Sequence, residues 1–122
     1  MDENSLQKIK NELHNGLASQ IAGNQGRARV CARRAAGWAI QEHLQQQGKP
    51  VPSTIALELI KYFASLDSHP DQVNRVLHHL IIRVEKNSFE EESYYPIEGV
   101  DLVAEAHWLV QELLGVEFPL EG

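Results

Sequence analysis

The sequence predicts an all-α fold, an up-and-down antiparallel bundle of four to five helices in one domain over residues 1–122. Five segments place apolar residues three and four positions apart, which is the period of one helix face. Glycine and proline separate these segments, and none of them alternates apolar and polar residues as a strand does. Short breaks favour antiparallel neighbours, and 122 residues suffice for one hydrophobic core.

The first two helices are predicted over residues 5–22 and from residue 24 or 25 to about residue 47. Asn4 is the expected N-cap of the first helix, and Gly23 is its expected end. The second helix ends at the segment GKPVP, and it carries a stripe of small residues: Ala28, Ala32, Ala35 and Ala39. Its roughly opposite side carries Val30, Gly37 and Leu44. A helix that is apolar on two faces is expected to run through the middle of the bundle.

Three more helices are predicted over residues 53–66, from the segment SHPDQV to residue 86 or 87, and over residues 100–114. In SHPDQV, Ser68 is the expected cap, Pro70 fits the first turn and Asp71 completes a capping box. Gly115 is expected to end the last helix. Residues 87–99 are polar, acidic and interrupted by proline, which predicts a connecting loop.

The formal net charge of −6 is unevenly distributed. Residues 1–84 hold ten basic and seven acidic residues, and residues 85–122 hold one basic and ten acidic residues. This acidic total argues against nucleic-acid binding driven by the field of the whole protein. The single cysteine, the absence of an apolar signal region and the short apolar runs predict a cytoplasmic protein that does not span a membrane.

Four arginines gather in the second helix: Arg27, Arg29, Arg33 and Arg34. Two interpretations of these arginines are open. They can be counterions for acidic residues of the second half: Glu90, Glu91, Glu92, Glu98, Asp101 and Glu105. They can also form a row of multidentate donors to phosphate, with Arg29 and Arg33 as one pair and Arg27 and Arg34 as the other.

The run GNQGRARVCARRAAGWAIQEHL, the short helix before it and the later run SYYPIEGVDLVAEAHWLVQELL resemble the HEPN domain family over most of the chain. The resemblance implies a helical bundle that forms a homodimer. It also implies contact with nucleotide or RNA, and a nucleotidyltransferase-type protein partner of the kind found in toxin–antitoxin systems. Active members of the family are metal-independent ribonucleases that carry an Arg-x4–6-His motif.

The chain departs from that ribonuclease motif, so no catalytic residue is carried over from the family. Arg75 precedes His78 and His79 too closely, and no arginine of the second helix has a histidine at the required distance. Arg75 and His79 lie four residues apart, on one side of the predicted fourth helix, and form an alternative catalytic pair.

Neither a metal site nor a cofactor site is predicted. The six histidines include no His-x-x-x-His pair, and one cysteine supplies no thiolate cluster. Cys31 is expected to be a small core residue rather than a nucleophile. The favoured hypothesis is a non-catalytic HEPN-like binding or regulatory module. The alternatives are a diverged ribonuclease and a purely structural dimerisation module.

Overall fold

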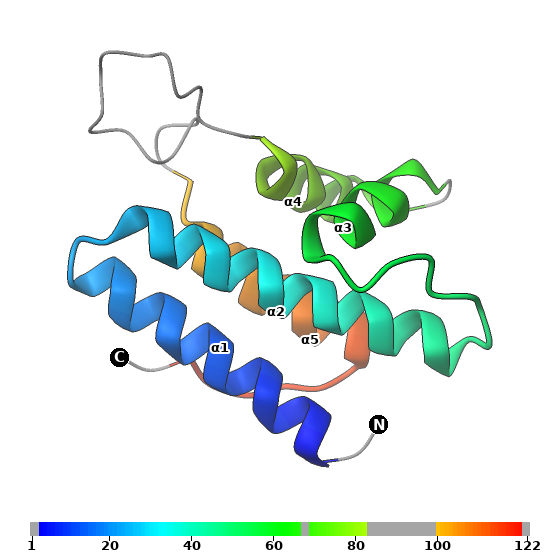
Figure 1. Cartoon of the computed structure of the whole chain (residues 1–122), viewed down its shortest axis with the longest axis horizontal. Helices are drawn as coiled ribbons and strands as arrows, with labels where there is room; N and C mark the ends of the chain where they lie inside the picture. Colours follow the sequence, from blue (N-terminus) through cyan, green and yellow to red (C-terminus); the bar gives the residue numbers. More distant parts are fainter. Residues whose placement is uncertain (1–2, 67–68, 83–99, 121–122) are drawn as a thin grey trace.

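A computed structural model describes residues 3–66, 69–82 and 100–120 of the chain (Figure 1). These residues form five α-helices and no strand: α1 (Glu3–Ile21), α2 (Gln25–Gln46), α3 (Ala56–Ser65), α4 (Asp71–Ile81) and α5 (Leu102–Leu114). The predicted all-α bundle is confirmed. None of these helices is long and apolar enough to cross a membrane.

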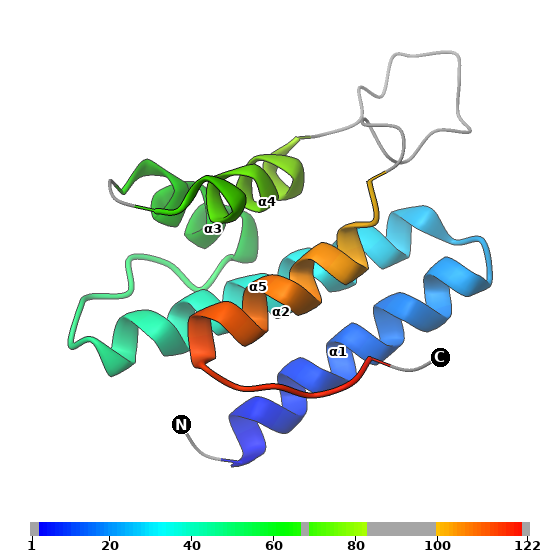
Figure 2. The same cartoon turned by 180° about the vertical axis from the view of Figure 1, so that it is seen from behind.

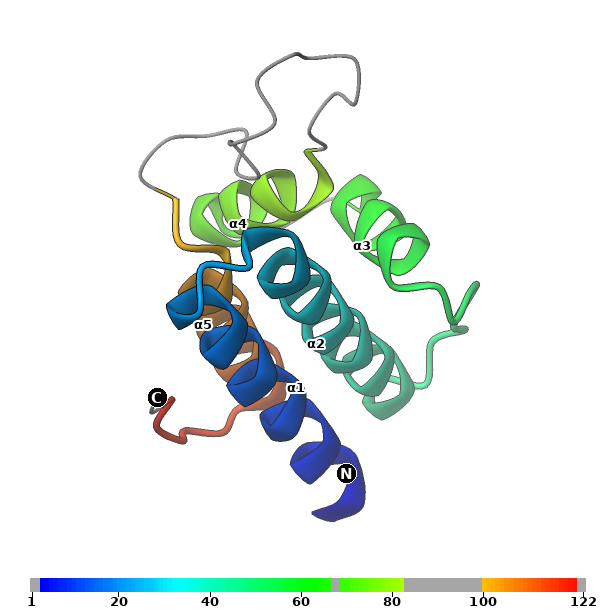
Figure 3. The ribbon, with the colours of Figure 1, turned by 60° about the vertical axis from the view of Figure 1, so that its left-hand side comes forward.

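The helix α2 lies at the centre of the bundle and packs against the other four helices. Figure 3 shows α1 and α5 on one side of α2 and α3 on the other, with α4 lying across the top between α5 and α3. The helix α1 runs antiparallel to α2 and to α5, as the predicted up-and-down bundle requires, but α2 and α5 run in the same direction, so the antiparallel prediction is wrong for that pair (Figure 1). Accordingly, the C-terminal ends of α2 and α5 meet, where His43 Nδ1 donates to the carbonyl oxygen of Leu113 at 3.1 Å. The α3–α4 pair returns the chain to the start of α5 and makes this parallel pairing possible.

The predicted central position of α2 is confirmed by its burial. Its alanine stripe is wholly buried: Ala28, Ala32, Ala35 and Ala39. On the other side Gly37 and Leu44 are also buried, but Val30 is 48% exposed, so the second apolar face is shorter than predicted. At Gly37 a β-carbon would stand 2.9 Å from the Cα atom of Ala56, which shows how closely α3 approaches α2.

Glycine ends three of the helices as predicted. Gly23, Gly48 and Gly115 have positive φ angles of 85°, 69° and 64°, in the left-handed region that glycine adopts at little cost. Asn24 begins α2, since its side chain accepts a hydrogen bond from the backbone N–H of Arg27 at 3.1 Å. This cap fills one of the otherwise unsatisfied donors of the first turn.

Several predicted helix starts are wrong by a few residues. Asn4 lies inside α1 rather than capping it, because that helix already includes Glu3. The helix α3 begins at Ala56 instead of residue 53, because the Ser53 hydroxyl accepts the N–H of Ile55 and forms a turn there. The helix α5 begins at Leu102, after Asp101 as its cap.

The ends of α4 also differ from the prediction. Pro70 occupies the N-cap position instead of the first turn, and the expected cap Ser68 lies outside the described residues. The helix stops at Ile81 rather than at residue 86 or 87, because Ile82 has an extended backbone. The predicted loop over residues 87–99 also lies outside the described residues.

After Gly115 the chain continues without helix over residues 116–120, which we call the C-terminal strap. Figure 2 shows the strap leaving the end of α5 and crossing α1. Phe118 is the buried residue of the strap and belongs to the hydrophobic core.

Candidate functional site

Arg33 holds the C-terminal end of α4 against α2. Its Nε donates to the carbonyl oxygen of Leu80 at 2.6 Å, and its Nη2 donates to that of Ile82 at 2.8 Å. The last carbonyls of a helix lack partners within the helix, and a cation placed there also complements the helix dipole. Two backbone carbonyls at the end of α4 are therefore partners of Arg33.

Arg34 points to the opposite side of α2, toward α1. Its Nη1 lies 3.8 Å from Glu12 Oε1, and its guanidinium carbon is 5.4 Å from the centre of the Trp38 ring. Among the described residues, Arg34 thus has a carboxylate counterion, and that carboxylate belongs to the first half of the chain. Arg33 and Arg34 therefore contact different neighbours, α4 in one case and α1 in the other.

Two of the carboxylates expected to balance these arginines have other partners. Asp101 accepts the backbone N–H of Ala104 and the side-chain amide of Gln20, both at 3.0 Å. Glu105 accepts a hydrogen bond from His79. Of the other carboxylates proposed as counterions, residues 90–92 and 98 lie outside the described residues. Arg27 is exposed and Arg29 is half-buried, on either side of the buried Ala28.

The alternative pair Arg75 and His79 lies on α4 where this helix faces α5. His79 Nδ1 donates to Glu105 Oε1 at 2.7 Å, and the two side chains are 13% and 26% exposed. A carboxylate in this position fixes the tautomer and the orientation of the imidazole. Arg75 is exposed, one turn earlier on the same helix. Within the described part of the chain its guanidinium makes no hydrogen bond and no ion pair.

Arg75 and Trp108 line one groove between α4 and α5. Its volume is about 380 Å³. The groove is lined by residues of both helices and by the cap of α5: Gln72, Arg75, Val76, Asp101, Ala104, Glu105 and Trp108. Clefts of this size hold small organic ligands. A guanidinium and an indole in one groove can bind an anionic group and an aromatic ring together.

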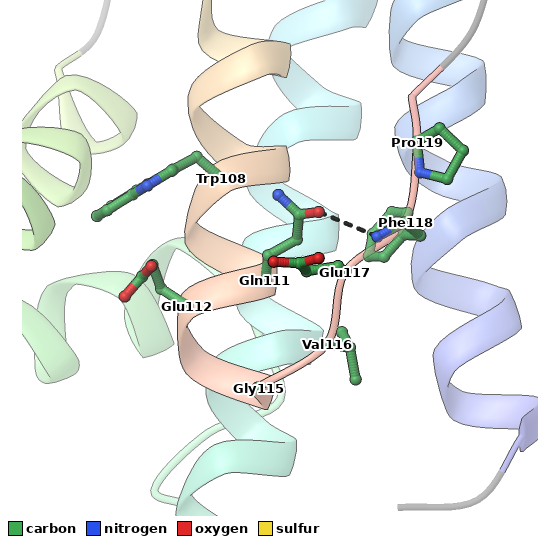
Figure 4. A pocket seen from close by; sticks show the side chains of 8 residues that line it. All are labelled: Trp108, Gln111, Glu112, Gly115, Val116, Glu117, Phe118 and Pro119. Atoms are coloured by element: carbon green, nitrogen blue, oxygen red, sulfur yellow. Dashed lines mark hydrogen bonds between the residues drawn. The ribbon is translucent and has the colours of Figure 1, made fainter.

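A second hollow of about 920 Å³ lies on the other side of Trp108, between α5 and the C-terminal strap. Figure 4 shows Trp108 and Glu112 pointing away from the strap, while Gln111 points toward it. The charged residues that line this hollow are the carboxylates of Glu112 and Glu117. Its charge therefore disfavours phosphate, and the α4–α5 groove is the better candidate site for an anionic ligand.

The described histidines do not form a metal site, and no group of three or more potential metal ligands is present among the described residues. Instead, three of the histidines donate hydrogen bonds to backbone carbonyl oxygens. His43 donates to Leu113, His69 to Phe63 and His107 to Phe118, at 3.1, 2.7 and 2.7 Å.

Cys31 is buried as predicted. Burial, with a smaller contribution from its hydrogen bond to Glu12, raises the pKa of the thiol to about 11. A thiol in this state is a poor nucleophile at neutral pH. The prediction that Cys31 is a core residue is therefore confirmed.

The sequence paired Arg75 with His79 but did not predict that Trp108 lies in the same groove as Arg75. The signal that was available is the helical period, since Ala104 and Trp108 share one side of α5 as Arg75 and His79 share one side of α4. The sequence did not predict that α4 packs against α5, or that Glu105 accepts a hydrogen bond from His79.

We compared the chain with protein families, with curated proteins and with solved structures. None of these comparisons gives a match. The groove between α4 and α5 therefore supplies the functional argument through its own chemistry.

Proposed function

We propose that this protein is a non-catalytic binding or regulatory module that contacts the phosphate and base of a nucleotide or of single-stranded RNA. The observation that carries the proposal is that Arg75 and Trp108 line the same groove between α4 and α5. Arg75 contacts the phosphate in this proposal, and Trp108 stacks on the base.

The chemistry of the two side chains supports this ligand class. A planar guanidinium donates two parallel hydrogen bonds to a phosphate, and an indole face stacks on any base with about 1–3 kcal/mol. The two acidic residues of the groove already accept hydrogen bonds from other groups, Asp101 from Ala104 and Glu105 from His79. Their repulsion of a phosphate is thereby reduced, and Arg75 remains available for it.

A phosphate bound by the pair Arg29 and Arg33 would compete with contacts that Arg33 already makes within the fold, whereas one bound by Arg75 would not. Arg33 already donates to Leu80 and Ile82. A phosphate bound there would compete with the attachment of α4 to α2. We therefore place the phosphate contact at Arg75 in preference to α2.

Trp108 fluorescence provides the test. In the Trp38→Phe background Trp108 is the only tryptophan of the chain. Titration with AMP, ATP, GTP and a short single-stranded RNA should quench it saturably, and the affinity should fall as salt rises. Arg75→Ala should abolish the quenching, whereas the matched control Arg34→Ala should retain it. Absence of quenching by all four ligands, or unchanged binding by Arg75→Ala, would contradict the proposal.

A diverged metal-independent ribonuclease is the second candidate, and the His79–Glu105 hydrogen bond favours it. A carboxylate that orients an imidazole leaves the other ring nitrogen to exchange a proton with a substrate. In that case the chain cleaves RNA in the presence of EDTA, and His79→Ala loses the cleavage. Cleavage that persists in His79→Ala would rule out this role.

The HEPN resemblance adds two proposals about assembly, a homodimer and a nucleotidyltransferase-type partner. Light scattering of the purified chain over a range of concentrations tests the first. Co-purification with the product of a neighbouring nucleotidyltransferase gene tests the second. A dimer that binds no ligand would favour the purely structural alternative.

A further inference from the structure

The C-terminal strap is bound to the helices in the way a peptide is bound to a receptor. Its central residue, Phe118, is 8% exposed. The backbone N–H of Phe118 donates to Gln111 Oε1 at 3.0 Å, and its carbonyl oxygen accepts from His107 Nε2 at 2.7 Å. Figure 4 shows Gln111 reaching from α5 to the strap for the first of these bonds.

The ring of Phe118 has its own contacts. The His107 ring packs edge to face against it, with centroids 4.8 Å apart. The ammonium of Lys10, on α1, lies 5.1 Å from the centre of the ring. We call Lys10, His107 and Gln111 the strap seat. The seat thus contacts one extended residue through its N–H, its carbonyl and its aromatic side chain.

The strap seat belongs to the helices and not to the strap. Its residues lie within α1 and α5, and α5 ends with hydrogen bonds from the N–H groups of Gly115 and Val116 to the carbonyl oxygen of Gln111. Gly115 has the left-handed conformation and is the natural hinge for the residues that follow. Release of the strap from Glu117 onward would therefore uncover the seat and leave these helical hydrogen bonds in place.

We propose that the strap seat is a peptide-recognition site, filled by Phe118 of the same chain until a partner protein displaces it. The partner segment is extended, carries a phenylalanine and is acidic beside it. The seated strap itself shows this chemistry, with Glu117 directly before Phe118, and Lys10 of the seat is complementary in charge. Recognition through backbone hydrogen bonds and one side-chain pocket is a common mode for extended peptides. This inference does not depend on the α4–α5 groove.

Tethering sets how the seat responds to a partner. A strap joined to its seat by a short hinge competes at an effective concentration of about millimolar. A free peptide of the same sequence should therefore bind weakly to the wild-type chain and well to a chain whose strap lacks the phenylalanine ring.

The test uses the full chain and a fluorescent peptide, Gly-Val-Glu-Phe-Pro-Leu-Glu-Gly, which has the sequence of residues 115–122. In fluorescence anisotropy the peptide should bind Phe118→Ala at least about tenfold more tightly than wild type, because the tethered competitor is weakened. A peptide with alanine in place of phenylalanine should not bind. The double variant Phe118→Ala, Gln111→Ala should lose binding, and Glu112→Ala in place of Gln111→Ala is the matched control.

Phe118→Leu is the second receptor, for use if circular dichroism shows that Phe118→Ala does not fold. Absence of peptide binding to the folded variant would overturn the proposal, and so would equal binding of the alanine peptide. Wild-type dimers that dissociate on Phe118→Ala substitution would show that a second copy supplies the segment, which would overturn a separate partner.

Discussion

Replacement of Arg33 by alanine is expected to destabilise the protein far more than replacement of the neighbouring Arg34. Arg33→Ala removes two hydrogen bonds from α2 to the end of α4, at the carbonyl oxygens of Leu80 and Ile82. Arg34→Ala removes an ion pair with Glu12 at 3.8 Å, in which the Arg34 side chain is 54% exposed, and a contact with the Trp38 ring at 5.4 Å. The two variants lose the same charge from adjacent positions, so the difference between their stabilities reports the contacts of Arg33 relative to those of Arg34.

The expected loss of stability in Arg33→Ala follows from the charge of the guanidinium donors and from their partial burial. A hydrogen bond that involves a charged group contributes roughly 1.5–3 kcal/mol, and water can replace part of that at the half-buried Arg33. Removal of the two bonds should therefore lower the free energy of unfolding by about 2–4 kcal/mol. The ion pair of Arg34 contributes about 0.2–1 kcal/mol, because solvent screens its half-exposed guanidinium.

Urea unfolding followed by circular dichroism measures both values. In thermal unfolding, at about 4 °C per kcal/mol for a domain of this length, Arg33→Ala should lower the Tm by about 8–16 °C. Arg33→Lys should lie between wild type and Arg33→Ala, since an ammonium lacks the planar fork that reaches both carbonyls. Equal stabilities of Arg33→Ala and Arg34→Ala would refute the attachment of α4 through Arg33.

Three further predictions follow from close contacts and burial. Gly37→Ala should destabilise the fold by about 1–2 kcal/mol in urea unfolding, since the clash with Ala56 exceeds the gain in helix propensity; unchanged stability would contradict the close approach. Asp101→Ala should lower the free energy of unfolding by about 1 kcal/mol, because the N–H of Ala104 loses its capping acceptor, whereas Asp101→Asn should keep most of that stabilisation. Because burial raises the pKa of Cys31 from 9.0 to about 11, the folded chain should resist iodoacetamide at pH 8. The stability that the buried thiol contributes is present below pH 9 and should fall as pH rises toward 11, which unfolding curves across that range will measure.

Helix content and the central position of α2 could be predicted because both depend on local periodicity and on small residues. The alanine stripe of α2 is buried as its spacing indicated. Helix ends were predictable where glycine takes a positive φ, as at Gly115. The end of α4 was not, because apolar periodicity continues past Ile81 and the chain leaves the helix where Arg33 binds its carbonyls.

The candidate site was less accessible to sequence reasoning because it depends on which helices meet. Charge density drew attention to the arginines of α2, but density does not show that Arg33 donates to α4 and that Arg34 faces Glu12. The single Arg75, in a less conspicuous segment, reaches the groove with Trp108 only because α4 packs beside α5. That contact joins segments far apart in the chain, and no local pattern encodes it.

The parallel pairing of α2 with α5 has a consequence for synthesis on the ribosome. The α1–α2 hairpin is local in sequence and can form as soon as residues 3–46 have emerged. The helix α5 emerges last, so the side of α2 that it covers stays open to the surroundings while α3 and α4 are being made. A nascent chain stalled before residue 102 therefore presents uncovered alanine and leucine surface, which is the kind of surface that chaperones bind and through which unfinished chains aggregate.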